Sequence, residues 1–230
     1  MTPHAAPLTA HRRRTLTPNS HRSPRVYFAG PDVSTVGSKD FNLTEWVRKT
    51  WYIQEQQIVD YQPLSSFYCV AATYNLEGAT VPFFRGTVVT VYNNANNDKV
   101  NGPNTNKNNM TLCARAVNNT DSSRLAVAPC FLPNILAGPY WVLGIGKADD
   151  GTYEWAAVIG GEPSVKYDDG CTTKEEGTNN AGLWLFTREP KASKATLDAM
   201  HQLLKSKGVA TSRLHTVAHE GCEYRGAVLK

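Results

Sequence analysis

Short segments rich in Val, Thr, Tyr and Trp fill the middle of the chain, and Gly, Asn, Asp or Pro residues bound each of them. These residue types favour extended backbone between turns. The pattern predicts eight strands, at Trp51–Val59, Ser66–Asn75, Arg85–Asn94, Met110–Asn118, Arg124–Phe131, Tyr140–Gly146, Tyr153–Gly160 and Leu183–Arg188. Because several links are short turns, we expect an antiparallel all-β fold, either a sandwich or an up-and-down barrel.

One segment near the C-terminal end has the spacing of a helix. Leu197, Met200 and Leu204 repeat at intervals of three and four residues, Ser193 can cap the start, and Gly208 can end it. The pattern predicts a helix over 193–207. Its single apolar stripe must pack on another element, and the outside of the sheet is the surface expected to receive it.

Composition separates the first 40 residues from the rest. Residues 1–30 hold five arginines and no acidic residue, whereas 31–230 hold 19 basic and 20 acidic residues. We expect 1–40 to be a basic tail or a targeting segment such as an organelle transit peptide, and 41–230 to be one domain. A mispredicted start that removed a signal peptide is the other interpretation. A nearly neutral domain argues against nucleic-acid binding.

The uncharged run from Leu125 to Gly146 is long enough to cross a bilayer as a helix. Pro129, Pro133 and Pro139 interrupt it, however, and proline breaks helical hydrogen bonding. Two short strands joined by a turn fit the run better, so no transmembrane segment is expected.

The five cysteines contain no C-x-x-C pair, and the histidines show no metal-ligand spacing. We therefore expect no metal and no cofactor. Cys113 and Cys130 flank a predicted turn and could pair. An odd number of widely spaced cysteines is typical of an oxidising compartment, and Cys171 is left over or displaces one of the others.

The order of eight strands followed by one helix resembles the lipocalin family. Trp51-Tyr52 resembles the first family motif, although Lys49 stands where that motif has glycine. Tyr140–Leu143 and Tyr153–Val158 resemble the second. Leu183–Pro190, the helix and Thr211–Leu214 are similar to the branch that holds apolipoprotein D, bacterial lipocalins and chloroplast lipocalins.

The resemblance implies an eight-stranded up-and-down antiparallel barrel with one C-terminal helix packed outside. It also implies that a Cys69–Cys222 disulfide ties the C-terminal segment to the barrel. At the narrow end, we expect Trp51 to plug the barrel and Arg188 to cover its ring, which makes both residues structural.

Side-chain alternation then sorts the residues of the cup. If Arg188 points inward, Trp184 and Phe186 share its face, and relatives place a tryptophan like Trp184 in the cup wall. Cys69 is expected to face outward, as in the family. The expected ligand-binding residues are Tyr68, Val70, Tyr74, Val89, Val91, Tyr153, Trp155, Trp184 and Phe186, with Ala72 beside them; alternatively, these side chains only fill a core.

A cup of this composition predicts a protein that binds and carries or sequesters a small hydrophobic ligand, such as a lipid, fatty acid, retinoid, sterol or carotenoid. No catalytic residues are assigned. The alternatives are a lipocalin-fold enzyme of the de-epoxidase or isomerase kind, for which Cys113 is the one thiol candidate, and a protein-interaction module. We expect a secreted protein or one of an organelle (plastid) lumen, with peripheral membrane contact left open.

Overall fold

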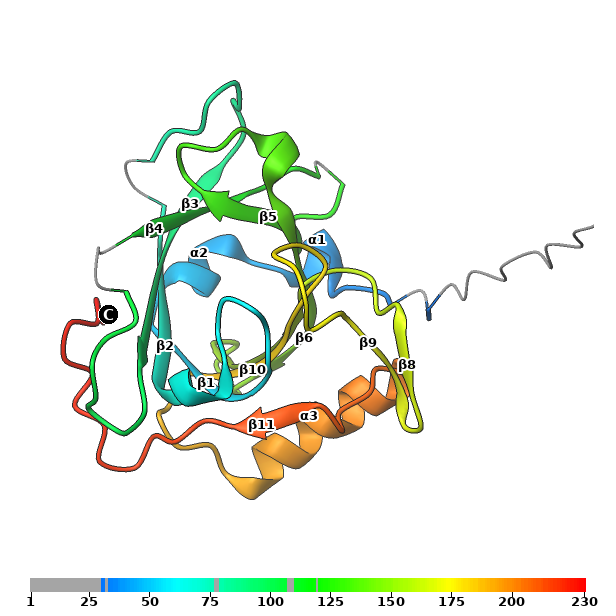
Figure 1. Cartoon of the computed structure of the whole chain (residues 1–230). Coiled ribbons are helices and arrows are strands. Elements are labelled where there is room, and N and C mark those ends of the chain that lie inside the picture. Colours follow the sequence, from blue (N-terminus) through cyan, green and yellow to red (C-terminus); the bar gives the residue numbers. More distant parts are fainter. Residues whose placement is uncertain (1–29, 32, 77–78, 107–109, 119) are drawn as a thin grey trace, which may run out of the picture.

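The computed structural model describes residues 30–31, 33–76, 79–106, 110–118 and 120–230. Its main sheet has the strand order β10-β7-β6-β5-β4-β3-β2-β1-β11, and a further pairing of β10 with β1 closes eight of these strands into a barrel. In Figure 1 helix α3 lies outside the ring of strands and helix α2 lies within it. The expected eight-stranded antiparallel barrel with an external C-terminal helix is confirmed.

Each barrel strand overlaps one predicted segment. The strands are β1 (Trp51–Gln57), β2 (Tyr68–Asn75), β3 (Val88–Asn96), β4 (Thr111–Arg115), β5 (Arg124–Pro129), β6 (Gly138–Lys147), β7 (Tyr153–Ile159) and β10 (Leu183–Thr187). The elements that the sequence pattern did not predict are short: α1 (Gly37–Asp40), α2 (Leu43–Val47), η1 (Leu64–Ser66), η2 (Asn134–Leu136), β8 (Val165–Tyr167), β9 (Gly170–Thr172) and β11 (Leu214–Thr216).

Helix α3 (Lys194–Ser206) forms where its spacing predicts it. The Ser193 side chain accepts a hydrogen bond from the Thr196 amide at 3.0 Å and caps the first turn. Gly208, at φ 68°, ends the helix, since few other residues adopt this left-handed conformation. The buried side chains of Met200 and Leu204 pack on the outer face of the barrel. Within the described residues, no helix is long and apolar enough to cross a membrane.

The segment before β1 closes one end of the barrel. Asn42 caps helix α2 by accepting a hydrogen bond from the Glu45 amide at 3.2 Å. This helix carries Trp46, which is fully buried with its ring centroid 4.8 Å from that of Trp51. The Arg188 guanidinium lies over the Trp51 ring, 3.6 Å from its centre. A stack of two indoles and one guanidinium therefore fills the narrow end.

Residues ahead of this plug also belong to the barrel domain. Val33 is buried in the outer cluster with helix α3, and the Val36 amide donates to the Val142 carbonyl at 3.0 Å. Residues 33–40, which the sequence analysis included in the expected tail of residues 1–40, therefore pack on the barrel. The predicted targeting role falls on residues 1–29, which lie outside the described residues.

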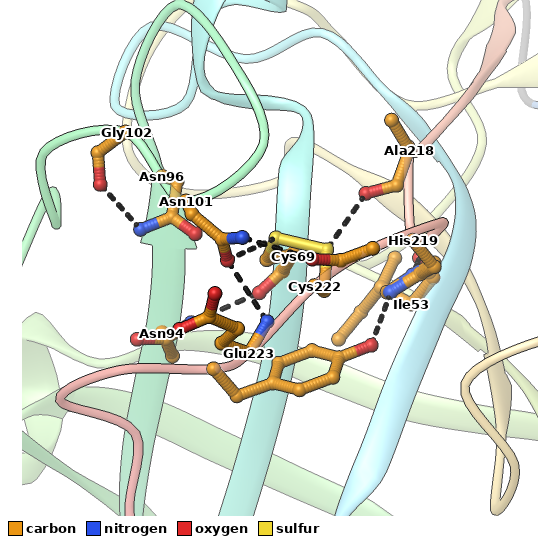
Figure 2. The surroundings of a disulfide bond; sticks show 12 residues. Ile53, Cys69, Asn94, Asn96, Asn101, Gly102, Ala218, His219, Cys222 and Glu223 are labelled. Atoms are coloured by element: carbon orange, nitrogen blue, oxygen red, sulfur yellow. Dashed lines mark hydrogen bonds between the residues drawn. A yellow bond between two sulfur atoms is a disulfide. The ribbon is translucent and has the colours of Figure 1, made fainter.

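The C-terminal segment is fixed along the outside of strand β2. A disulfide joins Cys69 to Cys222, with 5.6 Å between the Cα atoms, and the Cys69 amide donates to the Ala218 carbonyl at 2.9 Å. Figure 2 shows this bridge with Asn101 beside it, whose side-chain oxygen accepts from the Glu223 amide at 2.8 Å. A second disulfide joins Cys113 to Cys130 across β4 and the end of β5.

Candidate ligand-binding site

A cavity of about 630 Å³ opens into the barrel from the end opposite helix α2. Its upper part is bounded by the loops that follow β1, β3, β5 and β9, and its lower part by the inner faces of the strands. Among the described residues, its lining contains no Asp, Glu, Lys, Arg or His. The volume lies within the range of about 300–1,000 Å³ that small-molecule sites usually have.

Five of the nine expected ligand-binding residues line this cavity. They come from three different strands, and each sits where period-two alternation turns its side chain inward. These residues are Val70, Tyr74, Val91, Trp184 and Phe186, and Ala72 lies among them. Their contribution to ligand binding remains a proposal, taken up below.

The structure does not place Tyr68, an expected ligand-binding residue, in the cavity lining, and a β-bulge lies directly after it. Cys69 has a φ of 52°, and the pairing of β2 with β3 shifts register between Tyr68 and Ala71. Cys69 is turned out to meet Cys222, as expected, and the Tyr68 side chain does not join the cavity lining.

The structure does not place Trp155, another expected ligand-binding residue, in the cavity lining either. The pairing of β6 with β7 matches Gly146 to Trp155 and then Lys147 to Tyr153, so Glu154 is the extra residue of a bulge. Trp155 therefore packs in the outer cluster beneath helix α3. Gly146 opposite leaves the space that the indole occupies, because a Cβ atom at this position would collide with the ring.

Val89 and Tyr153 do point inward, but they lie below the cavity. Val89 is part of the buried core at the narrow end. The Tyr153 hydroxyl accepts from the Asn42 amide at 2.6 Å and donates to the Asp40 carbonyl at 3.1 Å. It thus anchors the N-terminal segment at the base, where a separate hollow of about 380 Å³ lies between α1 and the β6–β7 turn.

Two tyrosines form the polar part of the cavity floor. The hydroxyls of Tyr74 and Tyr140 are 2.9 Å apart, and both rings meet the buried ring of Trp46 edge-on. Burial raises the pKa of both phenols above the usual value, so they stay neutral at physiological pH. The sequence analysis noted Tyr140 only as part of a motif and missed its place in the site.

The sequence analysis missed further wall residues because bulges and loops set their positions. On strand β1 the pairing shifts between Ile53 and Glu55, and Gln56 then shares the inner face with Ile53. Strict alternation along β1 predicts the opposite face for Gln56. Other missed residues of the wall include Leu112, Val127, Leu132 and Leu136.

The cysteine thiol proposed for an enzyme is absent from the cavity. Cys113, the one candidate, is bonded to Cys130 and has no free thiol. Among the described residues, the free cysteine is Cys171, which is buried on β9, outside the barrel wall. The described lining of the cavity therefore consists of neutral hydrogen-bonding groups and apolar surface.

No family model and no curated protein sequence matches this chain. Its structure is similar to that of lobster apocrustacyanin A1, with a TM-score of 0.53 and 15% identity over 86% of this chain and 93% of the other. Apocrustacyanin C2 gives a TM-score of 0.53 and 17% identity over 85% of this chain and 93% of the other. Both of these proteins have the lipocalin fold, and the barrel of this chain with its external helix has the same fold.

Proposed function

We propose that this protein binds a small, elongated, neutral hydrophobic molecule in its barrel cavity and carries or sequesters it. The observation that carries the proposal is the cavity of about 630 Å³, whose described lining has no ionisable acid or base other than tyrosine. Moving even a neutral polar group into such a site without a hydrogen-bond partner costs on the order of 2–7 kcal/mol of desolvation. A charged metabolite would therefore lose at least several kcal/mol on binding. Apolar molecules with one weakly polar group avoid most of this cost.

The rim of the cavity supports the same ligand class. The loop after β5 exposes Phe131 and Ile135, at 73% and 88% of their full accessible area, and Met110 and Tyr61 are exposed on neighbouring loops. An apolar entrance lets a hydrophobic ligand leave water gradually as it enters. A fatty acid is expected to bind with its carboxylate near this entrance, and neutral retinoids or sterols with comparable or better affinity.

The proposal includes the branch and the compartment. The string Leu183–Pro190 and the bridge between Cys69 and Cys222 support a place near the apolipoprotein D, bacterial and chloroplast lipocalins. Two disulfides support an oxidising compartment, where such bonds persist. Secretion would account for both disulfides.

Titration of Trp184→Ala tests the site. Trp184 forms one wall of the cavity, and truncating it to Ala is expected to weaken retinol, cholesterol and oleate binding by about tenfold, since it removes roughly 1.4 kcal/mol or more of contact. Retinol is followed by its own fluorescence and the other two by displacement of retinol, so the loss of an indole does not affect the readout.

Trp155→Ala is the matched control. It removes an indole from the neighbouring strand β7, but on the outer face under helix α3. We expect this variant to lose thermal stability and to keep wild-type affinities. Equal affinities in wild type and Trp184→Ala, or no saturable binding of any of the three ligands by wild type, would contradict the proposed function.

A further inference from the structure

The inner wall contains one residue whose polar atoms the fold leaves unsatisfied. Gln56 lines the cavity and is completely buried, and within the described residues neither its carboxamide oxygen nor its nitrogen has a hydrogen-bond partner. Leaving a buried donor or acceptor unpaired destabilises the folded state, so folded proteins rarely retain such a group without a use for it.

His215, which lies beside Gln56, also has a buried polar atom that no described residue satisfies. Gln56 pairs in register with His215 of β11, and residues directly opposite each other in antiparallel strands point to the same face. The His215 ring meets that of Phe67, a member of the inner core, at 6.3 Å between centroids. Its Nε2 is also buried without a partner in the described part of the chain.

The other polar groups of the cavity contrast with this pair. At the floor, Tyr74 and Tyr140 satisfy each other through their hydroxyls. On the upper wall, the Asn94 amide donates to the Cys69 carbonyl at 2.9 Å, and its oxygen accepts from Asn104 at 2.7 Å. Among the described lining residues, Gln56 is therefore the one whose buried donor and buried acceptor both lack a partner within the protein.

We propose that the carboxamide of Gln56, with His215 next to it, is the polar recognition point for the ligand. A carboxamide offers one donor group and one acceptor. Its complement is a neutral group that both accepts and donates, which is an alcohol or a primary amide. A carboxylate only accepts, and an ether or hydrocarbon cannot donate.

The position of Gln56 also sets how the ligand lies. On β10 the residue paired with Gln56 is Trp184, whose ring forms part of the same wall. The ligand's hydroxyl is bound beside this indole, and its apolar body extends toward Val70 and Phe186. The carboxamide is covered in the structure, and a change of side-chain rotamer, which is common on binding, turns it into the cavity.

This inference rests on the proposed function, and a pair of ligands separates the two. All-trans-retinol and its methyl ether share the same apolar body, but the ether has lost the O–H donor. Wild type is expected to bind retinol about tenfold more tightly than the ether, the effect of one hydrogen bond of about 1.4 kcal/mol. Both ligands are titrated by their own fluorescence.

Gln56→Met tests the residue. Methionine keeps the length and unbranched shape of glutamine but removes both polar atoms. We expect the variant to melt at or above the wild-type temperature, because it removes an unsatisfied buried group. It is expected to bind the two ligands equally, mainly through weaker retinol binding.

Gln54→Met is the control on the same strand. The Gln54 carboxamide faces away from the cavity and bonds to the carbonyls of Glu189 and Pro190 at 3.3 and 3.2 Å. This variant is expected to melt earlier than wild type and to keep the tenfold preference for retinol.

Each outcome of these titrations decides one point. Tight but equal binding of retinol and ether by wild type overturns the role of Gln56 and leaves the proposed function standing. A tenfold preference that survives Gln56→Met also overturns it. If wild type binds neither retinoid, nor the sterol or fatty acid tested above, the proposed function fails together with the inference.

Discussion

Replacement of Arg188 tests whether the closed end of the barrel is a structural device separate from the binding site. Its guanidinium donates to the backbone carbonyls of Glu45 at 2.7 Å, Trp46 at 3.1 Å and Thr50 at 3.4 Å, and also to that of Lys49. Burial lowers the pKa of Arg188 to about 10, so the side chain remains charged at pH 7. One cation therefore ties helix α2 to the start of β1.

The expected cost of Arg188→Met follows from these contacts. The loss of a guanidinium over an indole removes about 0.5–2 kcal/mol. Leaving buried carbonyls unpaired costs about 1–3 kcal/mol each, and these costs are not additive because the carbonyls share one donor group. We expect a total loss of about 3–5 kcal/mol in the free energy of unfolding. Arg188→Lys should recover less than half, since an ammonium cannot match the planar fork of donors.

Urea unfolding followed by circular dichroism measures this effect, and retinol titration of the folded variant measures the binding site. With a slope of about 2 kcal/mol per M, the midpoint should fall by about 1.5–2.5 M. Retinol affinity should stay within about twofold of wild type, because Arg188 does not line the cavity. A midpoint that holds while binding is lost would refute the structural assignment of Arg188.

Three further results are expected. Replacing Cys69 and Cys222 together by Ser should lower the unfolding free energy by about 2–5 kcal/mol, measured by urea unfolding, because it releases the C-terminal segment; a free thiol at either position in protein from an oxidising host would contradict the bridge. Trp46→Ala should cost about 3–5 kcal/mol in the same assay, since it empties the floor, and a loss below about 1 kcal/mol would show that the plug is dispensable. Burial alone would raise the carboxyl pKa values of Glu45 and Asp121, but their hydrogen bonds and neighbouring cations hold these pKa values below the usual 4.5 and 3.8. The two carboxylates therefore stabilise the fold above about pH 4.5, and this stabilisation is lost as the pH falls below that value. Glu45→Gln should flatten the plot of urea midpoint against pH between about pH 5 and 3.

The barrel could be predicted from the sequence because its strands depend on local composition and its helix on a regular stripe. Strands such as Tyr153–Ile159 begin where their segment begins in the sequence pattern. Helix α2 was missed because it has only five residues, too few to show periodicity. Its signal was the pair Asn42 and Glu45, the spacing of a capping box, which stands directly before the apolar Trp46 and Val47.

The site was predicted less completely because side-chain alternation assumes an unbroken ladder. Phe186 faces the cavity as alternation along β10 predicts, since the pairing of β10 with β7 has no bulge. Tyr68 and Trp155 lie next to bulges; Tyr68 does not line the cavity, and Trp155 packs in the outer cluster. The sequence carries one sign of the second bulge: Gly146 stands opposite a large indole.

The bulge in β1 has the largest consequence for chemistry. Starting from Trp51 and Ile53, which point inward, strict alternation would place Glu55 in the cavity and Gln56 outside it. The register shift after Ile53 exchanges the two. Glu55 now lies outside, where its carboxylate is 2.7 Å from Nε2 of His201 on helix α3, and the neutral carboxamide of Gln56 lies on the inner wall. A single extra residue thus keeps an anion out of the cavity and ties the outer helix to the barrel. It also leaves the inner wall with an uncharged donor and acceptor, which is what the proposed recognition of a neutral alcohol requires.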